Sequence, residues 1–305
     1  MDNLQKENPE VFWPTIILNV FIILICFYLL FVFLKSKTFH SWPCINIITF
    51  SLILFLDNIL RIIPLTDVNT SISVWEYIQG SLLVFFDKLI LSTLTMQSII
   101  IYLGVFSIDF YSKHQKAIFI TTFMIGLFIS IILTMIFILS GDIIEFAVYC
   151  YCGESEIKKI LDPSIISIYL AISFFCNLRS LCYISNIKKE ADSGKIEDLN
   201  FKHTLIRVIA MFLLNTLTYL VSYLIVYDII PIDYVDIIYL TTCLAIAIYN
   251  SFNEVVIKAT LQIFCKNTYE EKYKKFKDLK ILGEGYNDSN EDENEVERVR
   301  TDSFN

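Results

Sequence analysis

The feature that most constrains this chain is a series of seven apolar stretches, each long enough for one helix to cross a bilayer. The hydrocarbon core of a bilayer requires about 20 consecutive, mainly apolar residues. Of the 305 residues 55% are hydrophobic and only 18% are charged, which is unlike a soluble domain of this size. The sequence therefore predicts an all-α membrane protein, a seven-transmembrane helix bundle. Its expected spans are Phe12–Leu34, Ile45–Leu65, Trp75–Ile108, Ala117–Ser140, Pro163–Ile187, Thr204–Tyr227 and Val235–Ile257.

The third stretch differs from the others in its length and its charge. Trp75–Ile108 is longer than one crossing needs, so we expect it to tilt or to project beyond the bilayer. It carries Asp87 and Lys88, which give it the weakest hydropathy of the seven. Six spans would remain if it did not cross. The first stretch follows an acidic start and is too long for a cleaved signal peptide, so we expect it to serve as a signal anchor.

Lysine and arginine residues near the helix ends predict the orientation, because cytoplasmic loops carry the excess of these residues. With the N-terminus outside, the inner loops hold nine of them and the outer segments hold three. The outer segments are acidic, and Asn69 begins an Asn-Thr-Ser glycosylation sequon in one of them. An odd number of helices then places the C-terminus inside. We expect an integral multi-pass protein of the plasma membrane, with the lipid bilayer as a partner.

The chain divides into four predicted parts. They are a short extracellular N-terminus (1–11), the bundle (12–257), an amphipathic helix (258–282) and a disordered acidic cytoplasmic tail (283–305). The amphipathic segment mixes apolar residues with lysines, as in a helix that lies on an anionic membrane surface. Its Cys265 is a candidate acylation site, or else a free thiol. In the tail, two arginines precede Thr301 and Ser303, which are candidate phosphorylation sites or else stay unmodified.

Charged side chains inside the predicted spans cost free energy unless they meet partners or water. An outer group consists of Asp57, Arg61, Asp87 and Lys88. We expect Arg61 to reach the nearby membrane surface along its aliphatic stem. Asp57 and Lys88 should face the bundle, where they pair or line a polar cavity open to the outside. The group is a candidate ligand-binding site, with a purely structural ion pair as the alternative.

An inner group lies at the end of the seventh stretch, at Asn250, Asn253 and Glu254. Asn250 and Glu254 are four residues apart and so share one face of a continuous helix. They form a polar switch between helices, or they mark a helix end that meets water. Cations of the inner loops are a candidate coupling surface, or ordinary positive-inside charge. They include Lys188, Lys189, Lys202 and Arg207.

Residues that several classes of membrane protein need are missing. A retinal protein needs a lysine in the middle of the last helix, whereas Lys258 lies at its inner rim. The three histidines fall in inner loops, which argues against a clustered zinc site. The sequence shows neither paired aspartates of the GxGD type nor the two related halves common in transporters. We therefore expect no enzyme activity, catalytic residue, metal, cofactor or nucleic-acid partner.

Five short segments resemble segments of a known receptor family. They are DNILRIIP at Asp57–Pro64, LTMQSIIIYLGVF at Leu94–Phe106, FAVYCYCGE at Phe146–Glu154, IKKEADSGKIEDLNFKHTLIRVI at Ile187–Ile209 and IYNSFNEVVIKATLQIF at Ile248–Phe264. In layout and in these segments the chain resembles the cyclic-AMP-receptor-like G-protein-coupled receptors, a branch near the secretin-like group. The resemblance covers most of residues 12–265.

This resemblance implies a receptor that binds an extracellular ligand and couples to a heterotrimeric G protein. Such receptors usually bridge the second outer loop to the third helix, but SISVWEYIQGSLL has no cysteine, so Cys150 and Cys152 lack that partner. The DRY element of rhodopsin-like receptors is also absent, and SIDFYSKH stands in its place. The alternative function is a small-solute transporter or channel-like protein. Its path would be lined by Asp57, Lys88, Asn177 and Arg179.

Overall fold

The computed structural model describes residues 9–36, 42–63, 74–140, 143–145, 150–152, 156–190, 209–210, 212–214, 216–221, 232–252 and 254–265. This part of the chain is almost entirely helical, with one short hairpin. The longer helices are α2 (Pro9–Lys35), α3 (Trp42–Ile62), α4 (Val74–Phe106), α5 (Ile108–Ser140), α6 (Glu156–Glu190), α8 (Ile232–Ser251) and α9 (Glu254–Phe264). The antiparallel hairpin pairs β1 (Ile143–Glu145) with β2 (Cys150–Cys152), Ile144 lying opposite Tyr151.

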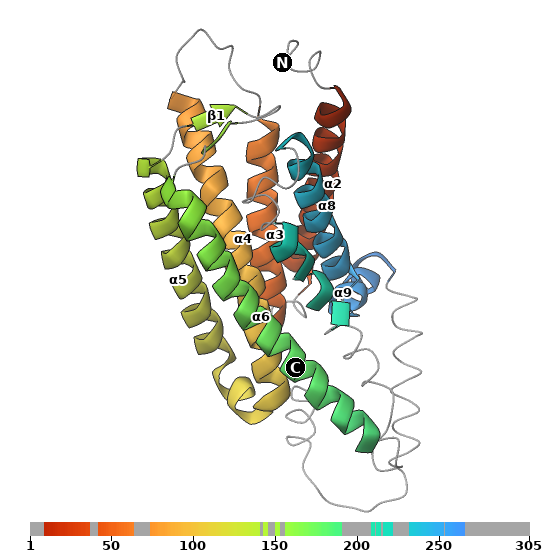
Figure 1. Cartoon of the computed structure of the whole chain (residues 1–305). Coiled ribbons are helices and arrows are strands. Elements are labelled where there is room, and N and C mark those ends of the chain that lie inside the picture. The colour runs from red at the N-terminus through yellow and green to blue at the C-terminus, as the bar shows by residue number, and fades with distance from the viewer. Residues whose placement is uncertain are drawn as a thin grey trace, which may run out of the picture.

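The helices form a bundle in which α4 is central (Figure 1). α4 packs against α3, α5 and α6, and the strand β2 also lies on it. α2 packs against α3 and α8, so the first and last long helices lie side by side. The hairpin lies at the end of the bundle where α2 begins (Figure 1). We call this the hairpin end.

Five of the predicted spans are confirmed as helices of membrane-crossing length and hydropathy. These helices indicate a multi-pass membrane protein, and counting a bent pair formed by α8 and α9 as one span gives six in the described part of the chain. The third stretch is among the five, at Tyr77–Phe106. The predicted sixth span lies largely outside the described residues, which include a shorter apolar helix over Phe212–Val221.

The seventh predicted span is not the single helix that we expected. α8 ends at Ser251, and the axis of the following helix is turned by 64°. The Ser251 hydroxyl donates to the carbonyl oxygen of Ala247 at 2.9 Å. Serine and asparagine compete in this way for backbone groups and so weaken a helix where they cluster. The break removes the shared face that we predicted for Asn250 and Glu254.

α5 begins nine residues before the predicted start at Ala117, so the residues of the expected inner loop are part of this helix. Only Ser107 separates α4 from α5, and its carbonyl accepts from the Tyr111 amide at 2.8 Å. This is the first hydrogen bond of a new helix, and serine is a favoured residue at that capping position. Lys113 and Lys116 are therefore helical and exposed.

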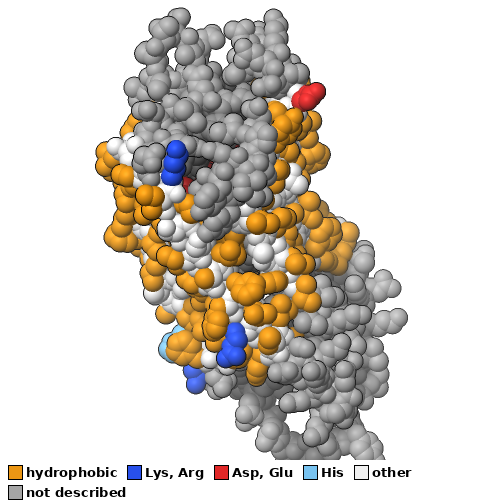
Figure 2. Space-filling model, in the orientation of Figure 1, with side chains coloured by type: hydrophobic (Ala, Val, Ile, Leu, Met, Phe, Trp, Pro, Cys, Tyr) orange, Lys and Arg blue, Asp and Glu red, His pale blue; other side chains and the backbone are white. Residues whose placement is uncertain are grey.

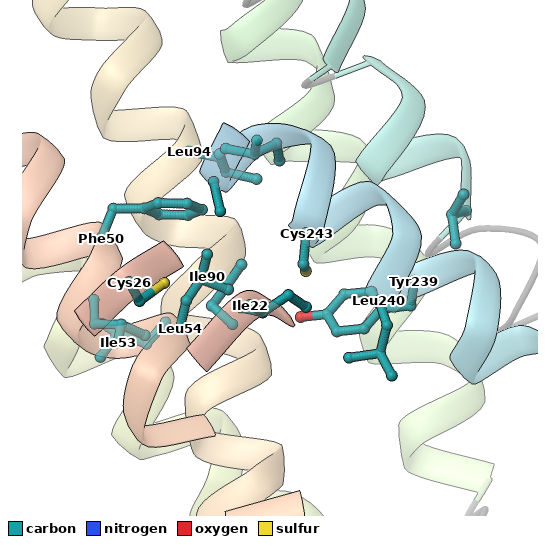
Figure 3. Packing of buried hydrophobic residues seen from close by; sticks show 14 residues of the cluster. Ile22, Cys26, Phe50, Ile53, Leu54, Ile90, Leu94, Tyr239, Leu240 and Cys243 are labelled. Carbon is teal, nitrogen blue, oxygen red and sulfur yellow. The ribbon is translucent and has the colours of Figure 1, made fainter. Parts of the chain in front are cut away.

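The largest buried cluster joins α2, α3, α4 and α8. Figure 3 shows Ile22, Phe50, Leu94 and Leu240 converging from these four helices. Burying such a side chain away from water stabilises a protein by roughly 1.5–3 kcal/mol. Between helices in lipid this driving force is absent, and close van der Waals packing stabilises the contact instead. The cluster therefore fixes the relative positions of the helices that carry the predicted outer charged group.

The surface of the described bundle is apolar, as expected for contact with lipid. Only 28% of the most apolar window is buried in each of α2 and α5, the two helices with the highest hydropathy. Exposed side chains include Phe27 on α2 and Phe128 on α5. Figure 2 shows hydrophobic side chains spread over the middle of the molecule. A soluble protein rarely exposes such continuous apolar surface.

Candidate functional site

A buried arginine joins three helices near the hairpin end. Arg61 Nε donates to Asp57 Oδ2 at 3.0 Å, within α3. Its Nη2 donates to Asp87 Oδ1 on α4 at 2.9 Å, and its Nη1 donates to Asp236 Oδ1 on α8 at 3.0 Å. Tyr239 donates to the same Asp87 oxygen at 3.1 Å, and the guanidinium carbon lies 5.4 Å from the centre of the Tyr239 ring. We call these five residues the Arg61 cluster.

Local helix geometry explains how these side chains meet. Asp57 and Arg61 are four residues apart on α3, and Asp236 and Tyr239 are three apart on α8, so each pair shares a face. The planar guanidinium carries five N–H donors and can therefore serve several carboxylates at once. Arg61 is only 2% exposed, which is possible because its charge is met by carboxylates on three helices.

A second ion pair connects α4 to α6. Lys88 Nζ lies 2.5 Å from Asp162 Oδ1, and both side chains are buried. The Lys88 ammonium is also 5.3 Å from the centre of the Phe137 ring of α5. We call Lys88 and Asp162 the Lys88 pair. It ties the start of α6 to the middle of α4.

Two of our expectations for this region are wrong. Asp57 pairs with Arg61, and Lys88 pairs with Asp162, so Asp57 and Lys88 do not form the predicted pair. Successive helix residues point about 100° apart, so Asp87 faces α3 and α8 while Lys88 faces α6. Arg61 does not extend to the membrane surface, since three buried or partly buried carboxylates hold it inside the bundle.

Sequence reasoning missed Asp162, Asp236 and Tyr239. Asp162 directly precedes the predicted fifth span and Asp236 is the second residue of the seventh, and we counted neither among the charged side chains inside the spans. An available signal was the unpaired charge of Arg61 and Lys88, because buried cations require nearby carboxylates. Searching the starts of the other predicted spans, and the residues just before them, for those carboxylates would have found both aspartates.

A neutral polar layer lies further along α4. The Tyr219 hydroxyl is 2.5 Å from Thr95 Oγ1 and 3.2 Å from Ser173 Oγ. One turn on, Asn177 Nδ2 donates to Ser98 Oγ at 3.0 Å. These contacts hold α4, α6 and the Phe212–Val221 helix together.

The structure brings together only some of the residues that were predicted to line a transporter path. Asn177 is buried against Ser98. Arg179 instead is exposed, with its guanidinium carbon 6.0 Å from the centre of the Phe175 ring. Asn177 and Arg179 therefore do not line one surface.

Most of the predicted inner site cannot be placed. Asn250 is 4% exposed, and its Nδ2 has no hydrogen-bond partner among the described residues. Lys188 and Lys189 belong to the last turn of α6, and Glu254 begins α9, but their side chains lie outside the described structure. Also outside it are Asn69, Lys202, Arg207, Asn253, Thr301 and Ser303.

The helix α9 packs against α2. The Tyr28 and Thr260 hydroxyls are hydrogen-bonded, and the Phe31 and Phe264 rings lie 6.1 Å apart. Cys265 follows the helix directly and is exposed. An acyl chain attached there would meet no steric barrier within the described structure.

Comparisons with known proteins identify no family for this chain. No protein-family model matches this sequence, and no curated protein matches it. Within the described residues, no three His, Cys, Asp or Glu side chains are grouped so that they could hold a metal ion. The Arg61 cluster and the Lys88 pair are therefore the features on which a functional argument can be built.

Proposed function

We propose that this chain is a seven-transmembrane signalling receptor of the G-protein-coupled type, resembling the cyclic-AMP-receptor-like branch. In this proposal the Phe212–Val221 helix is part of the sixth span, and α8 is the seventh. The N-terminus and the hairpin face the outside, and α9 lies at the cytoplasmic membrane surface as the start of the amphipathic helix. The receptor resides in the plasma membrane.

The observation that carries this proposal is the Arg61 cluster. Ionisable side chains inside a membrane protein are costly and mark functional sites by default. Here a single guanidinium connects α3, α4 and α8 near the hairpin end. A ligand that competes for any of these carboxylates changes the relative stability of two helix packings, as receptor activation requires.

The signal would reach the cytoplasmic end along α8. This helix carries Asp236 and Tyr239 at one end and ends at the bend after Ser251. A shift of α8 would move the bend and, through the contact between Tyr28 and Thr260, the position of α9 on α2. Cations of the inner loops would then contact the heterotrimeric G protein.

Nucleotide exchange tests the proposal. The full chain is reconstituted in liposomes with a heterotrimeric G protein, and binding of a non-hydrolysable GTP analogue is measured against empty liposomes. We expect faster exchange with the chain, because receptors of this kind populate the active packing to some extent without ligand. Replacing Lys188, Lys189, Lys202 and Arg207 by glutamine should remove the effect.

The transporter alternative predicts a different result in the same liposomes. Flux of a small solute that depends on Lys88 and is lost in Lys88→Met, together with unchanged nucleotide exchange for a panel of G proteins, would overturn the receptor proposal. The variant Arg179→Gln is the matched control, because this cation is exposed and lies outside both ion-pair groups.

A further inference from the structure

An arginine on the exposed face of α6 has no carboxylate partner in the described part of the chain. Arg179 is exposed, and it takes part in none of the ion pairs that join the described residues. It belongs to the span Lys159–Ile184 and lies five residues before the end of that span, which is about 7.5 Å along the helix axis. Ionisable side chains in membrane helices normally face the bundle interior and meet a partner there. Arg179 is therefore placed to meet an anion from outside the protein.

Four aromatic rings of α4 and α6 form a continuous row beside this arginine. Phe175 and Tyr183 lie one turn before and one turn after Arg179, so the three residues share one face of α6. The guanidinium carbon lies 6.0 Å from the centre of the Phe175 ring. On α4, the Tyr102 ring lies 6.2 Å from Phe175 and 4.7 Å from Phe106, and the Phe106 ring lies 4.7 Å from Tyr183. We call these five residues the Arg179 surface.

The Arg179 surface is open to the surroundings of the bundle. Phe175 and Tyr183 are 55% and 40% exposed, and Tyr102 and Phe106 are half-buried. The hydroxyls of Tyr102 and Tyr183 make no hydrogen bond to the described residues. Tyrosine is enriched where membrane proteins meet the lipid headgroups, because its ring is apolar and its hydroxyl is polar. The surface thus offers one guanidinium, two hydroxyl donors and a set of apolar rings to the same molecule.

We infer that the Arg179 surface binds the headgroup of an anionic phospholipid. A guanidinium can donate two parallel N–H bonds to a phosphate, and hydroxyl groups can donate to its remaining oxygens. The aromatic rings would contact the acyl chains of the same lipid. None of the five residues is a carboxylate that could receive the ammonium group of a zwitterionic headgroup, so an anionic lipid is the better match.

The depth of the site favours a lipid over a protein partner. Arg179 lies inside a helix segment of membrane-crossing length and hydropathy, where a water-soluble partner does not reach. From this depth its aliphatic stem allows the guanidinium to extend to the level of the phosphates. A bound lipid would bridge α4 and α6, because the row of rings comes from both helices.

This inference goes beyond the proposed function and does not require a G protein. The proposed orientation only decides the leaflet from which the lipid comes. With the hairpin end outside, the Arg179 surface lies toward the cytoplasmic leaflet, where anionic lipids are concentrated.

Thermal unfolding of the purified full chain in a neutral detergent tests the inference. The probes are dioctanoyl phosphatidylglycerol, dioctanoyl phosphatidylcholine with the same chains, and water-soluble glycerol phosphate, each titrated at constant ionic strength. Because a ligand that binds the folded state stabilises it, we expect phosphatidylglycerol alone to raise the unfolding temperature with a saturating concentration dependence. Arg179→Gln should weaken its apparent affinity about tenfold, as loss of a charged hydrogen-bond partner does.

Two conservative variants separate the parts of the site. Arg179→Lys keeps the charge but loses the two parallel donors, so it should retain more of the affinity than Arg179→Gln does. Tyr183→Phe removes only a hydroxyl and should weaken the apparent affinity about threefold, as loss of one hydrogen bond does. Without anionic lipid, all three variants should unfold at the wild-type temperature, because Arg179 has no ion-pair partner among the described residues.

Lys113→Gln is the matched control, since it removes an exposed cation near the start of α5 and should leave the phosphatidylglycerol titration unchanged. An equal loss of affinity in Lys113→Gln and Arg179→Gln would show a diffuse effect of surface charge and overturn the inference. Equal stabilisation by phosphatidylcholine would show that the headgroup charge is not read, and a shift with glycerol phosphate alone would show a site for free phosphate. Either result also overturns the inference, as does a large loss of stability of Arg179→Gln before any lipid is added.

Discussion

Arg61 is the residue on which the hairpin end of the bundle depends most. It forms ion pairs with carboxylates on α3, α4 and α8, and its removal would leave three acidic groups without their shared cation. Breaking a buried ion pair by deleting one partner typically costs about 3–5 kcal/mol, because the remaining charge is uncompensated. The stability of the fold therefore depends on the ion pairs that Arg61 makes.

Arg61→Met should be strongly destabilising, by about 3–5 kcal/mol, for this reason. The measurement is the unfolding temperature in detergent, with thiol-dye labelling beyond that of the exposed Cys182 and Cys265 as a second report on buried cysteines such as Cys243. Arg179→Met is the control, because Arg179 is exposed and should tolerate the change. Equal unfolding temperatures for Arg61→Met and wild type would contradict the buried position of Arg61.

A double-mutant cycle tests the Lys88 pair. Lys88→Met and Asp162→Asn should each destabilise the chain, and the double variant should lose less than the sum of the two, by a coupling of about 0.5–3 kcal/mol. Combining Lys88→Met with Asp57→Asn should instead be additive, because these residues have different partners. Coupling in the second cycle and additivity in the first would restore the pairing that we originally expected.

At the scale of elements, α4 and α5 approach closely at one glycine. A Cβ added at Gly126 would lie 2.0 Å from Ser92 Oγ and 3.2 Å from Ser92 Cβ. Small residues at helix interfaces allow such approaches between membrane helices. The α4–α5 contact therefore depends on the absence of a side chain at this position.

Gly126→Ala should destabilise the chain by about 1–3 kcal/mol, the usual cost of overpacking, and Ser92→Ala should partly rescue it by removing the clashing hydroxyl. Gly104→Ala is the matched control, since its added Cβ would meet nothing nearer than Tyr111 at 3.8 Å. The measurement is again thermal unfolding in detergent. Equal tolerance of both alanines would show that the helices are further apart than the structure has them.

The sequence predicted the helices better than it predicted their ends and contacts. Long apolar runs identify spans because an unpaired backbone cannot remain in hydrocarbon, so five spans were found, although α5 begins nine residues before its predicted start. The start of α5 at Ile108 and the break after Ser251 are local features of the backbone, which hydropathy does not register. Asp57, Arg61, Asp87 and Lys88 were predicted to lie in one outer group, but their pairing was not predicted. The Arg61 partner Asp236 is 175 residues away, and only the packing of α8 shows it.

At the scale of the whole molecule, the account requires a bundle whose hairpin end faces outward. In the proposed receptor, the Arg61 cluster lies toward that side, while α9 and Cys265 lie toward the other. The proposed arrangement, with the N-terminus outside and the C-terminus in the cytoplasm, requires the chain to cross the membrane an odd number of times.

The topology of the intact chain tests this requirement most directly. An epitope tag is placed at each terminus, and antibody access is measured in intact and in permeabilised cells. The account predicts that the N-terminal tag is accessible in intact cells and the C-terminal tag only after permeabilisation. Access to both tags on the same side would mean an even number of crossings and would contradict the receptor.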